Sequence, residues 1–287
     1  MVFHRLKMLF KKPDFRRNPF KASWKRLLWR LRWYLSSVPI ELHTPNGLRI
    51  LAPKGGAGAA IYYQGVSEPD VMSFIQGNLK HGNIFIDIGA HIGEYTLTAS
   101  KIVGNNGQVH AFEPSPHIFE ILKKNVNLNN LSNIFLNQKA VSDQNGDIQF
   151  EIHREPSISS VKKLHQSKNV PLQTISIESM RLDTYWKSVI KGSKVDLIKI
   201  DVEGAELLVL SGATELLSLN ADNAPIIIFE YSPKNYASFG IEPVQVLKLL
   251  KDLKYKIFTY SINEGLKPLR NIPSCDLNLV ATKAIIE

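Results

Sequence analysis

The chain has 287 residues, of which 44% are hydrophobic, with one cysteine, Cys275, and a formal net charge of +9. That length and composition can bury a full core, and a single cysteine excludes a disulfide framework and a cysteine-rich zinc cluster. The charge is concentrated, because residues 1–35 hold eleven of the 35 Lys and Arg residues and one of the 26 acids, which leaves +10 there and −1 on the remainder.

Residues 1–35 read as a basic leader. They contain neither the apolar run of a secretion signal nor the roughly 20 successive apolar residues of a membrane span. In the segment "KASWKRLLWRLRWYL", one face of a predicted helix collects Trp24, Leu27, Leu28, Leu31 and Leu35, with basic side chains on the flanks and back. Such a helix can lie in the interface of an anionic membrane. The alternatives are that the apolar stripe docks on the domain, or that the leader is a poorly ordered tail.

Residues 36–80 predict an N-terminal flap that precedes the main sheet. We expect short strands at "NGLRILAP" and "AAIYYQG", and a helix at "EPDVMSFIQGNLK". The glycine-rich "KGGAGAA" lacks the GK[ST] ending of a phosphate loop, so we expect a flexible turn there.

Residues 81–287 predict the main domain, in which strands and helices alternate. Helices follow the strands "NIFIDIG", "QVHAFEP", "VDLIKIDV" and "PIIIFEY". The strands "NIFLNQKAVS", which is the third in chain order, and "DIQFEIH" lie between "QVHAFEP" and "VDLIKIDV". The strands "YKIFTYS" and "LNLVATK" close the chain. Continuous apolar strands separated by helices favour a mostly parallel, doubly wound α/β sheet, with the last two strands as an antiparallel edge pair. Residues 154–173 are polar and aperiodic, which predicts a mobile lid or a specificity insert.

Polar residues follow five strands, at the edge where ligands bind in such a sheet. They are Asp87, Gly89, His91 and Gly93 after the first strand, Glu113 after the second, Ser142 and Asp143 after the third, Asp201 and Glu203 after the fourth, and Glu230 with Tyr231 after the fifth. Any one acid alone has a simpler interpretation as a helix cap or a solvated loop residue.

Together these residues suit a nucleoside that carries a positive charge. Gly89 and Gly93 permit the backbone to approach the ligand closely. Glu113 can accept hydrogen bonds from both ribose hydroxyls, and Asp143 can accept one from an adenine amine. A dinucleotide fold would also place an acid on the ribose. However, acids at both ends of the glycine loop, Asp87 and Glu94, repel a pyrophosphate and suit a sulfonium. These charges favour S-adenosylmethionine as the ligand.

The motifs "FIDIGAHIGEYT", "VHAFEPSP", "NQKAVSD", "RLDTY", "DLIKIDVEGAE" and "PIIIFEYSP" resemble the FkbM family of S-adenosylmethionine-dependent methyltransferases. The resemblance runs from about Ile84 to Tyr260, and His91 stands where the family often has Asn. It implies a Rossmann-like, seven-stranded methyltransferase sheet with helices on both faces. It also implies, most often, O-methylation of a hydroxyl on a sugar, glycan or secondary metabolite.

The resemblance further implies roles for the residues at the strand ends. Asp87, Gly89, His91 and Gly93 would hold the methionine part of the donor, Glu113 the ribose, and Ser142 with Asp143 the adenine.

The chemistry would fall to the fourth and fifth strand ends. Methyl transfer needs alignment of the donor with the acceptor and removal of a hydroxyl proton. Asp201 or Glu203 is the first candidate for the base that removes this proton, Glu230 is the second, and His91 is the last. Alternatively, Asp201 only positions the methyl donor, and Glu203 and Glu206 only lie in the first turn of a helix, where the helix dipole favours acidic side chains.

Other polar residues of these motifs have structural alternatives. We expect Asp183 to cap a helix, whereas Lys199 could pair with an acid or contact substrate. Asp201 and Glu203 could offer oxygens to Mg²⁺, but nothing requires a metal, so we expect none.

The partner expected on these grounds is a small-molecule or glycan acceptor. We expect a cytoplasmic protein, with peripheral contact at the inner membrane surface through the leader as an additional hypothesis. An RNA methyltransferase and a non-catalytic donor-binding module are the competing functions. Residues 36–287 show no basic track or base-stacking site, which argues against nucleic acid.

Overall fold

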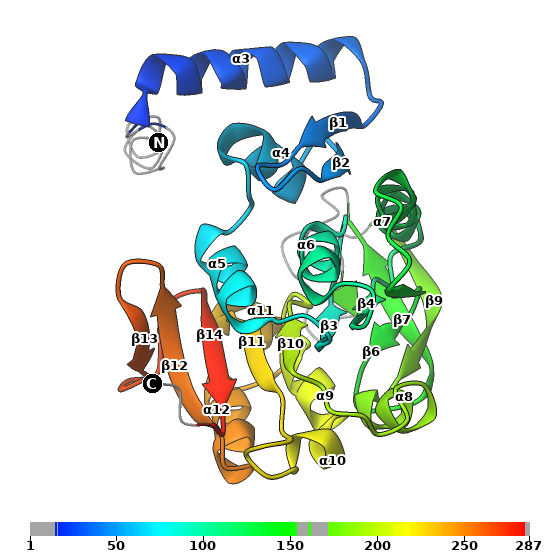
Figure 1. The fold of residues 1–287 in the computed structure, drawn as a ribbon, viewed down its shortest axis with the longest axis vertical. Helices are drawn as coiled ribbons and strands as arrows, with labels where there is room; N and C mark the ends of the chain where they lie inside the picture. Colours follow the sequence, from blue (N-terminus) through cyan, green and yellow to red (C-terminus); the bar gives the residue numbers. More distant parts are fainter. Residues whose placement is uncertain (1–14, 16, 154–159, 162–171, 285–287) are drawn as a thin grey trace. The chain divides into compact units, whose positions relative to one another are not determined.

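An eight-stranded mixed sheet is the centre of the unit that spans Pro69–Glu287 (Figure 1). The computed structural model describes residues 15, 17–153, 160–161 and 172–284. Across the sheet the strands follow the order β13 (Gly265–Pro268), β12 (Lys256–Ser261), β14 (Leu277–Thr282), β11 (Ile226–Tyr231), β10 (Leu197–Ile200), β3 (Ile84–Ile88), β4 (Gln108–Phe112) and β5 (Ile134–Asn137).

The strand directions confirm the predicted α/β class. The five strands from β11 to β5 are mutually parallel, and β14 and β12 form the predicted antiparallel pair. The short strand β13, which pairs antiparallel with β12, was not predicted; it forms the edge of the sheet and adds an eighth strand to the seven that the resemblance implied. The central strands are mostly apolar because both faces of the sheet are covered, and Ile86, Ile198 and Phe229 are almost fully buried.

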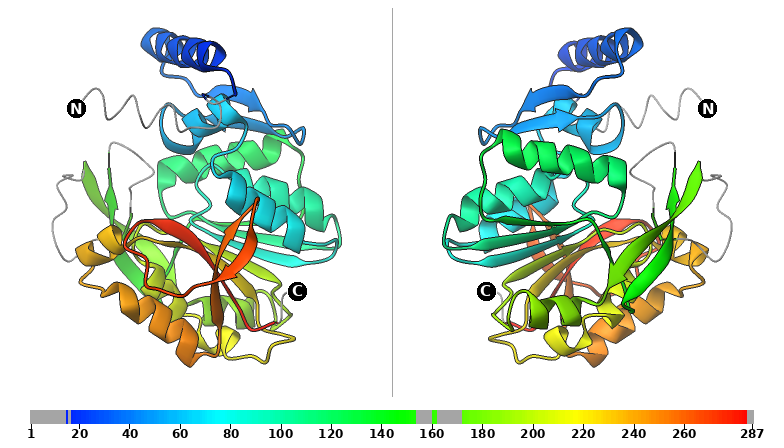
Figure 2. Two further views of the ribbon diagram at one scale, coloured as in Figure 1. Left: turned by 90° about the vertical axis from the view of Figure 1, so that its left-hand side faces the viewer. Right: turned by 90° about the vertical axis from the view of Figure 1, so that its right-hand side faces the viewer.

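Helices cover both faces of the sheet (Figure 2). One face carries α5 (Pro69–Asn78), α6 (Glu94–Val103) and α7 (Pro116–Leu128). The other carries α8 (Leu182–Ser188), α9 (Glu206–Ser211), α10 (Thr214–Leu217), α11 (Pro233–Ser238) and α12 (Pro243–Asp252).

The sequence predicts one helix over "GAELLVLSGATELL", after the strand "VDLIKIDV", and this is wrong because the structure divides the segment into α9 and α10. The break includes Gly212, which packs against the backbone of Ser142. A Cβ at Gly212 would lie 1.9 Å from the Ser142 carbonyl oxygen, so only glycine fits at this approach. The break thereby brings the 206–217 segment up against the loop that carries Ser142 and Asp143.

A second sheet of four strands was not predicted. Its order is β6 (Ala140–Val141), β9 (Gln173–Met180), β7 (Gly146–Ile152) and β8 (Ser160–Val161). The sequence prediction merged β5 and β6 into one strand and missed β9, although Ile175 and Ile177 alternate there with polar residues. Of the predicted lid at 154–173, residues 154–159 and 162–171 lie outside the described residues.

The unit Met1–Glu68 contains α3 (Pro19–Leu35), a hairpin of β1 (Ile40–His43) and β2 (Arg49–Ala52), and α4 (Gly56–Gln64). The expected strand at "AAIYYQG" and the flexible turn before it are wrong, because this segment is helix α4. Gly58 and Ile61 lie three residues apart and form its buried face. Gly58 has no space for a side chain, since a Cβ would lie 2.5 Å from the Pro53 carbonyl oxygen.

Asn18 caps the N-terminus of helix α3, because its side chain accepts a hydrogen bond from the Lys21 N–H. Among the described residues, no helix combines the length and the apolar character that crossing a membrane requires. The boundary between the two units falls at Glu68–Pro69, inside the stretch 36–80 that we interpreted as a flap.

Candidate active site

Asp87, the second-last residue of β3, is a fully buried carboxylate next to the loop that follows this strand. Its Oδ2 accepts a hydrogen bond of 2.6 Å from the Thr96 hydroxyl, and its Oδ1 lies 3.8 Å from the Lys199 ammonium. Burial raises the pKa of Asp87, while the charge of Lys199 and the Thr96 hydroxyl oppose that shift. Asp87 therefore lies inside the sheet and supports the loop through Lys199 and Thr96.

The glycines of this loop adopt backbone conformations that other residues rarely accept. Gly89 and Gly93 have φ values of 80° and 92°, and His91 between them has a φ of 50°. A Cβ at Gly89 would lie 1.8 Å from the Asp201 carbonyl oxygen, so the loops after β3 and β10 touch at this point. Desolvation lowers the pKa of the His91 imidazole to about 4, which keeps it neutral at pH 7.

Glu113, after β4, is oriented by two backbone N–H groups. Its Oε2 accepts from the His91 N–H at 2.9 Å, and its Oε1 accepts from the Ser115 N–H at 2.9 Å. Each oxygen keeps a further lone pair, so the carboxylate can still accept two hydroxyl donors side by side. This pair of acceptor oxygens fits the vicinal hydroxyls of a ribose. Burial raises the pKa of Glu113 to about 7, although both N–H groups oppose the shift.

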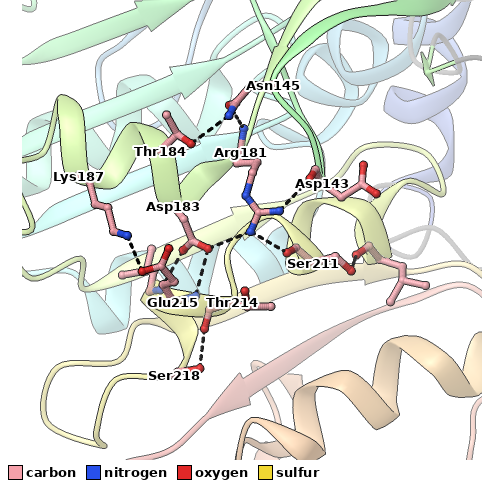
Figure 3. Close-up of polar contacts among 12 residues, drawn as sticks. Asp143, Asn145, Arg181, Asp183, Thr184, Lys187, Ser211, Thr214, Glu215 and Ser218 are labelled. Atoms are coloured by element: carbon pink, nitrogen blue, oxygen red, sulfur yellow. Dashed lines mark hydrogen bonds and ion pairs between the residues drawn. The ribbon is translucent and has the colours of Figure 1, made fainter.

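The loop that carries Ser142 and Asp143 is held by Arg181 (Figure 3). The Ser142 hydroxyl donates to Asp143 Oδ1 at 3.0 Å, and Arg181 Nη1 donates to the Asp143 carbonyl oxygen at 2.8 Å. The Arg181 N–H donates to the side-chain oxygen of Asn145 at 2.9 Å. Sequence reasoning did not assign a role to Arg181, although it is the first residue of the "RLDTY" motif.

Asp183 confirms its predicted capping role on a helix that follows later in the chain. Its two oxygens accept from the N–H groups of Glu215 and Leu216 at the start of α10, at 3.1 and 2.9 Å. Arg181 Nη2 also approaches Asp183 Oδ2, at 3.3 Å (Figure 3). The loop at Asp143 and helix α10 thus share one pair of charged side chains.

Three partly exposed carboxylates come together at the ends of β10 and β11. One oxygen each of Asp201, Glu203 and Glu230 lies within 4.8 Å of the others. Lys199 Nζ lies 3.2 Å from Asp201 Oδ2 and donates to the Gly89 carbonyl oxygen at 3.3 Å. Of the two roles expected for Lys199, the structure shows the ion pair. The oxygens could hold a divalent cation, but such clusters also occur without one.

Glu203 is fixed from two sides. On the side-chain side, the Asn235 amide donates a hydrogen bond to Glu203 Oε2 at 3.0 Å. On the backbone side, Glu203 lies in a tight turn, where its φ is 57°. The buried Glu206 Oε1 accepts from the N–H groups of Val202 and Gly204 at 3.0 and 3.3 Å. Glu206 therefore holds the turn on which Glu203 sits, a role that the sequence interpretation missed.

Burial also sets the protonation of Glu206. It raises the pKa of Glu206 to about 8, and the negative charge of Glu230 adds to the shift. The only sequence signal for this role was the spacing of acids in "DVEGAE", which is also what a helix N-terminus favours.

The family model for the FkbM methyltransferase domain matches residues 87–257, which is more than half of the chain. The chain is 29% identical to hexuronic acid methyltransferase AglP from Haloferax volcanii, over 65% of this chain and 69% of that protein. It is 30% identical to 2-O-methyltransferase NoeI from Sinorhizobium fredii, over 60% of this chain and 72% of that protein.

Among solved structures, it is similar to a SAM-dependent O-methyltransferase from Thermotoga maritima. The TM-score is 0.42 at 14% identity, over 87% of this chain and 79% of that one. Because the family model spans so much of the chain, the protein belongs to the FkbM family of methyltransferases and uses S-adenosylmethionine as its methyl donor.

Proposed function

We propose that the protein methylates a hydroxyl oxygen of a sugar, a glycan or another secondary metabolite. The observation that supports this best is the group of three carboxylates, Asp201, Glu203 and Glu230, within 4.8 Å of one another at adjacent strand ends. Carboxylates can accept a hydroxyl proton and hydrogen bonds from neighbouring hydroxyls, which a polyol acceptor offers. Two relatives, a hexuronic acid methyltransferase and a 2-O-methyltransferase, support the same acceptor class by their names.

The donor end of the proposed site comprises the loops after β3, β4 and β6. Glu113 would accept the ribose hydroxyls, because its two oxygens are already oriented by backbone N–H groups. Ser142 and Asp143 would contact the adenine, on a loop that Arg181 holds in place. Asp87, Gly89, His91 and Gly93 would shape the part that receives the methionine moiety.

The acceptor end would do the proton chemistry. S-adenosylmethionine supplies a methyl group that its sulfonium already activates, so the protein's task is alignment and removal of the hydroxyl proton. We assign the proton to an oxygen of Asp201 or Glu203, with Glu230 as the third candidate. The Asn235 amide would keep Glu203 facing the acceptor. His91 is neutral at pH 7 and could also accept a proton, although its pKa of about 4 makes it a weak base.

The test is methyl incorporation by the full-length protein from labelled donor into defined acceptors. We expect label in free uronic acids or in glycans, and no label in the same acceptors after their hydroxyls are blocked. Mass spectrometry of the product would locate the methyl group on oxygen. Label in RNA instead would support the RNA methyltransferase. Donor binding without transfer to glycan, lipid or RNA fractions would support the non-catalytic module.

We also propose that the protein acts in the cytoplasm, with peripheral contact at an anionic membrane surface through residues 1–35. The membrane contact is supported by the charge of +10 on this segment against −1 on the rest of the chain. Fractionation of cells that express the tagged protein would test this placement.

A further inference from the structure

Helix α3 carries two apolar faces, and one of them packs within its own unit. Trp29 and Trp33 are buried against Ala52, together with the rings of Tyr62 and Tyr63. The Trp29 and Tyr62 ring centroids are 4.8 Å apart, and Trp29 Nε1 donates to the Lys54 carbonyl oxygen at 3.2 Å. These contacts hold α3 to α4 and β2 by this face.

The opposite face of α3 is an exposed apolar stripe. A helix turns about 100° per residue, so Trp24 lies about 180° from Trp33, nine residues later. We define the outer face of α3 as Phe20, Trp24, Leu27, Leu28, Leu31 and Leu35. The exposed fractions of these six residues lie between 39% and 88%. Six large apolar side chains in one exposed stripe are unfavourable in water and mark an interaction surface.

The charges around the outer face show what kind of surface it fits. Helix α3 contains five basic residues and no acid. Lys21 and Arg32 lie on one flank of the outer face, and Arg30 lies on the other. An apolar stripe with Trp and Leu between basic flanks matches the boundary of an anionic bilayer, where acyl chains lie beneath phosphate and carboxylate groups. A protein partner would need an apolar groove with acidic rims on both sides.

We propose that the outer face of α3 inserts into the interface of an anionic lipid bilayer, while Trp29 and Trp33 keep the helix attached to α4. The helix then lies in the plane of the membrane, with Trp24 and Leu31 among the acyl chains and Lys21 and Arg30 at the headgroups. This inference rests on the proposed peripheral contact and specifies the face that makes it. It does not depend on the identity of the methyl acceptor.

The test is flotation of the full-length protein with phosphatidylcholine vesicles, with and without phosphatidylserine. The unaltered protein should float with the anionic vesicles and much less with the neutral ones. The double variant Trp24→Ser, Leu31→Ser should bind anionic vesicles at least about tenfold more weakly, because both side chains lose their favourable transfer from water. The matched control Ile262→Ser, Ile272→Ser changes two exposed apolar residues on the other unit and should bind like the unaltered protein.

Further arms separate the remaining explanations. The double variant Lys21→Gln, Arg30→Gln should bind anionic vesicles more weakly and bind neutral vesicles like the unaltered protein. Equal flotation of the Trp24, Leu31 variant and the unaltered protein would overturn the proposal, as would no flotation of the unaltered protein. Loss of a dimer on size-exclusion chromatography without any vesicle binding would assign the outer face to a second copy instead. Calorimetry of donor binding to the same samples reports on the methyltransferase function separately, so either hypothesis can fail alone.

Discussion

The ammonium of Lys199, a residue of β10, lies 3.2 Å from a carboxylate oxygen of Asp201, which directly follows this strand. The same ammonium lies 3.8 Å from Asp87 and 5.0 Å from the Tyr95 ring centroid. The nearly buried ammonium of Lys199 therefore links β10 to β3, the strand that carries Asp87. Lys199 has a structural role in the site whether or not it meets a substrate.

We expect Lys199→Gln to lower the free energy of unfolding by about 3 to 5 kcal/mol. The reason is that it leaves the buried Asp87 carboxylate without its cation, and an uncompensated buried charge is costly. Chemical denaturation at pH 7 would measure the loss. The double variant Asp87→Asn, Lys199→Gln removes both charges and should regain part of the stability. A double variant that is no more stable than Lys199→Gln would contradict the pairing.

Asp201→Asn keeps the size of the side chain but removes its basic oxygen. If Asp201 accepts the hydroxyl proton, turnover should fall by about 10²-fold or more, while the Kd for S-adenosylmethionine changes little. Steady-state kinetics and calorimetry on the same preparation would separate the two effects. Glu203→Gln and Glu230→Gln are the matched variants, and the base is the residue whose change lowers kcat most. A large rise in the donor Kd of Asp201→Asn would assign it to donor positioning.

Glu113→Ala should weaken donor binding by about 1 to 3 kcal/mol, because it removes charge-assisted hydrogen bonds to the ribose. Glu264→Gln, which changes an exposed acid on the surface, serves as the control. Unchanged donor affinity in a folded Glu113→Ala protein would remove Glu113 from the ribose site.

The raised pKa of Glu113 adds a pH dependence to this binding. Since the pKa is about 7 and the ionised carboxylate is the better acceptor, donor affinity should rise as the pH increases from 6 to 8. Glu113→Gln should show a flatter profile over the same range.

Glu206→Gln should change how stability depends on pH. The Glu206 pKa is about 8 in the folded protein against an ordinary value of 4.5, so between these values the folded state binds the extra proton. Unfolding then releases a proton, and the free energy of unfolding falls as the pH rises, by up to about 1.4 kcal/mol per pH unit from this group.

Urea denaturation at several pH values between 5 and 8 would measure the effect. The Gln variant cannot ionise, so its stability should fall less steeply than that of the unaltered protein. Glu264→Gln should behave like the unaltered protein, because Glu264 is exposed. Parallel curves for the unaltered protein and Glu206→Gln would show that Glu206 is not the group that titrates.

Much of the site could be predicted because its residues follow strands that the sequence marks clearly. Apart from Asp87, Lys199 and Glu230, the runs that become β3, β10 and β11 are apolar, which is what a strand covered on both faces requires. Parallel neighbours end at one edge of the sheet, so Asp201 and Glu230 had to lie near each other once β10 and β11 paired. Their chemical roles remain predictions.

Other features had weak or misleading local signals. Helix α4 is short and apolar, and a short apolar run does not distinguish a buried helix from a strand. The partners of Arg181 and Glu206 could not be read from spacing either. Arg181 reaches Asp143, 38 residues away, and that contact exists only after β6 and β9 have paired.

Helix α3 best separates what each level determined. By itself the sequence established that residues 19–35 are amphipathic and basic, because side chains three and four residues apart share a face. The same periodicity describes both apolar faces and favoured the one with more leucines. The tertiary structure buried Trp29 and Trp33 instead, because the Trp29 ring packs against Tyr62 and Tyr63 of α4 and edge-on against Trp33. Which apolar face is buried depends on complementary shapes across the contact, and those shapes exist only in the folded unit.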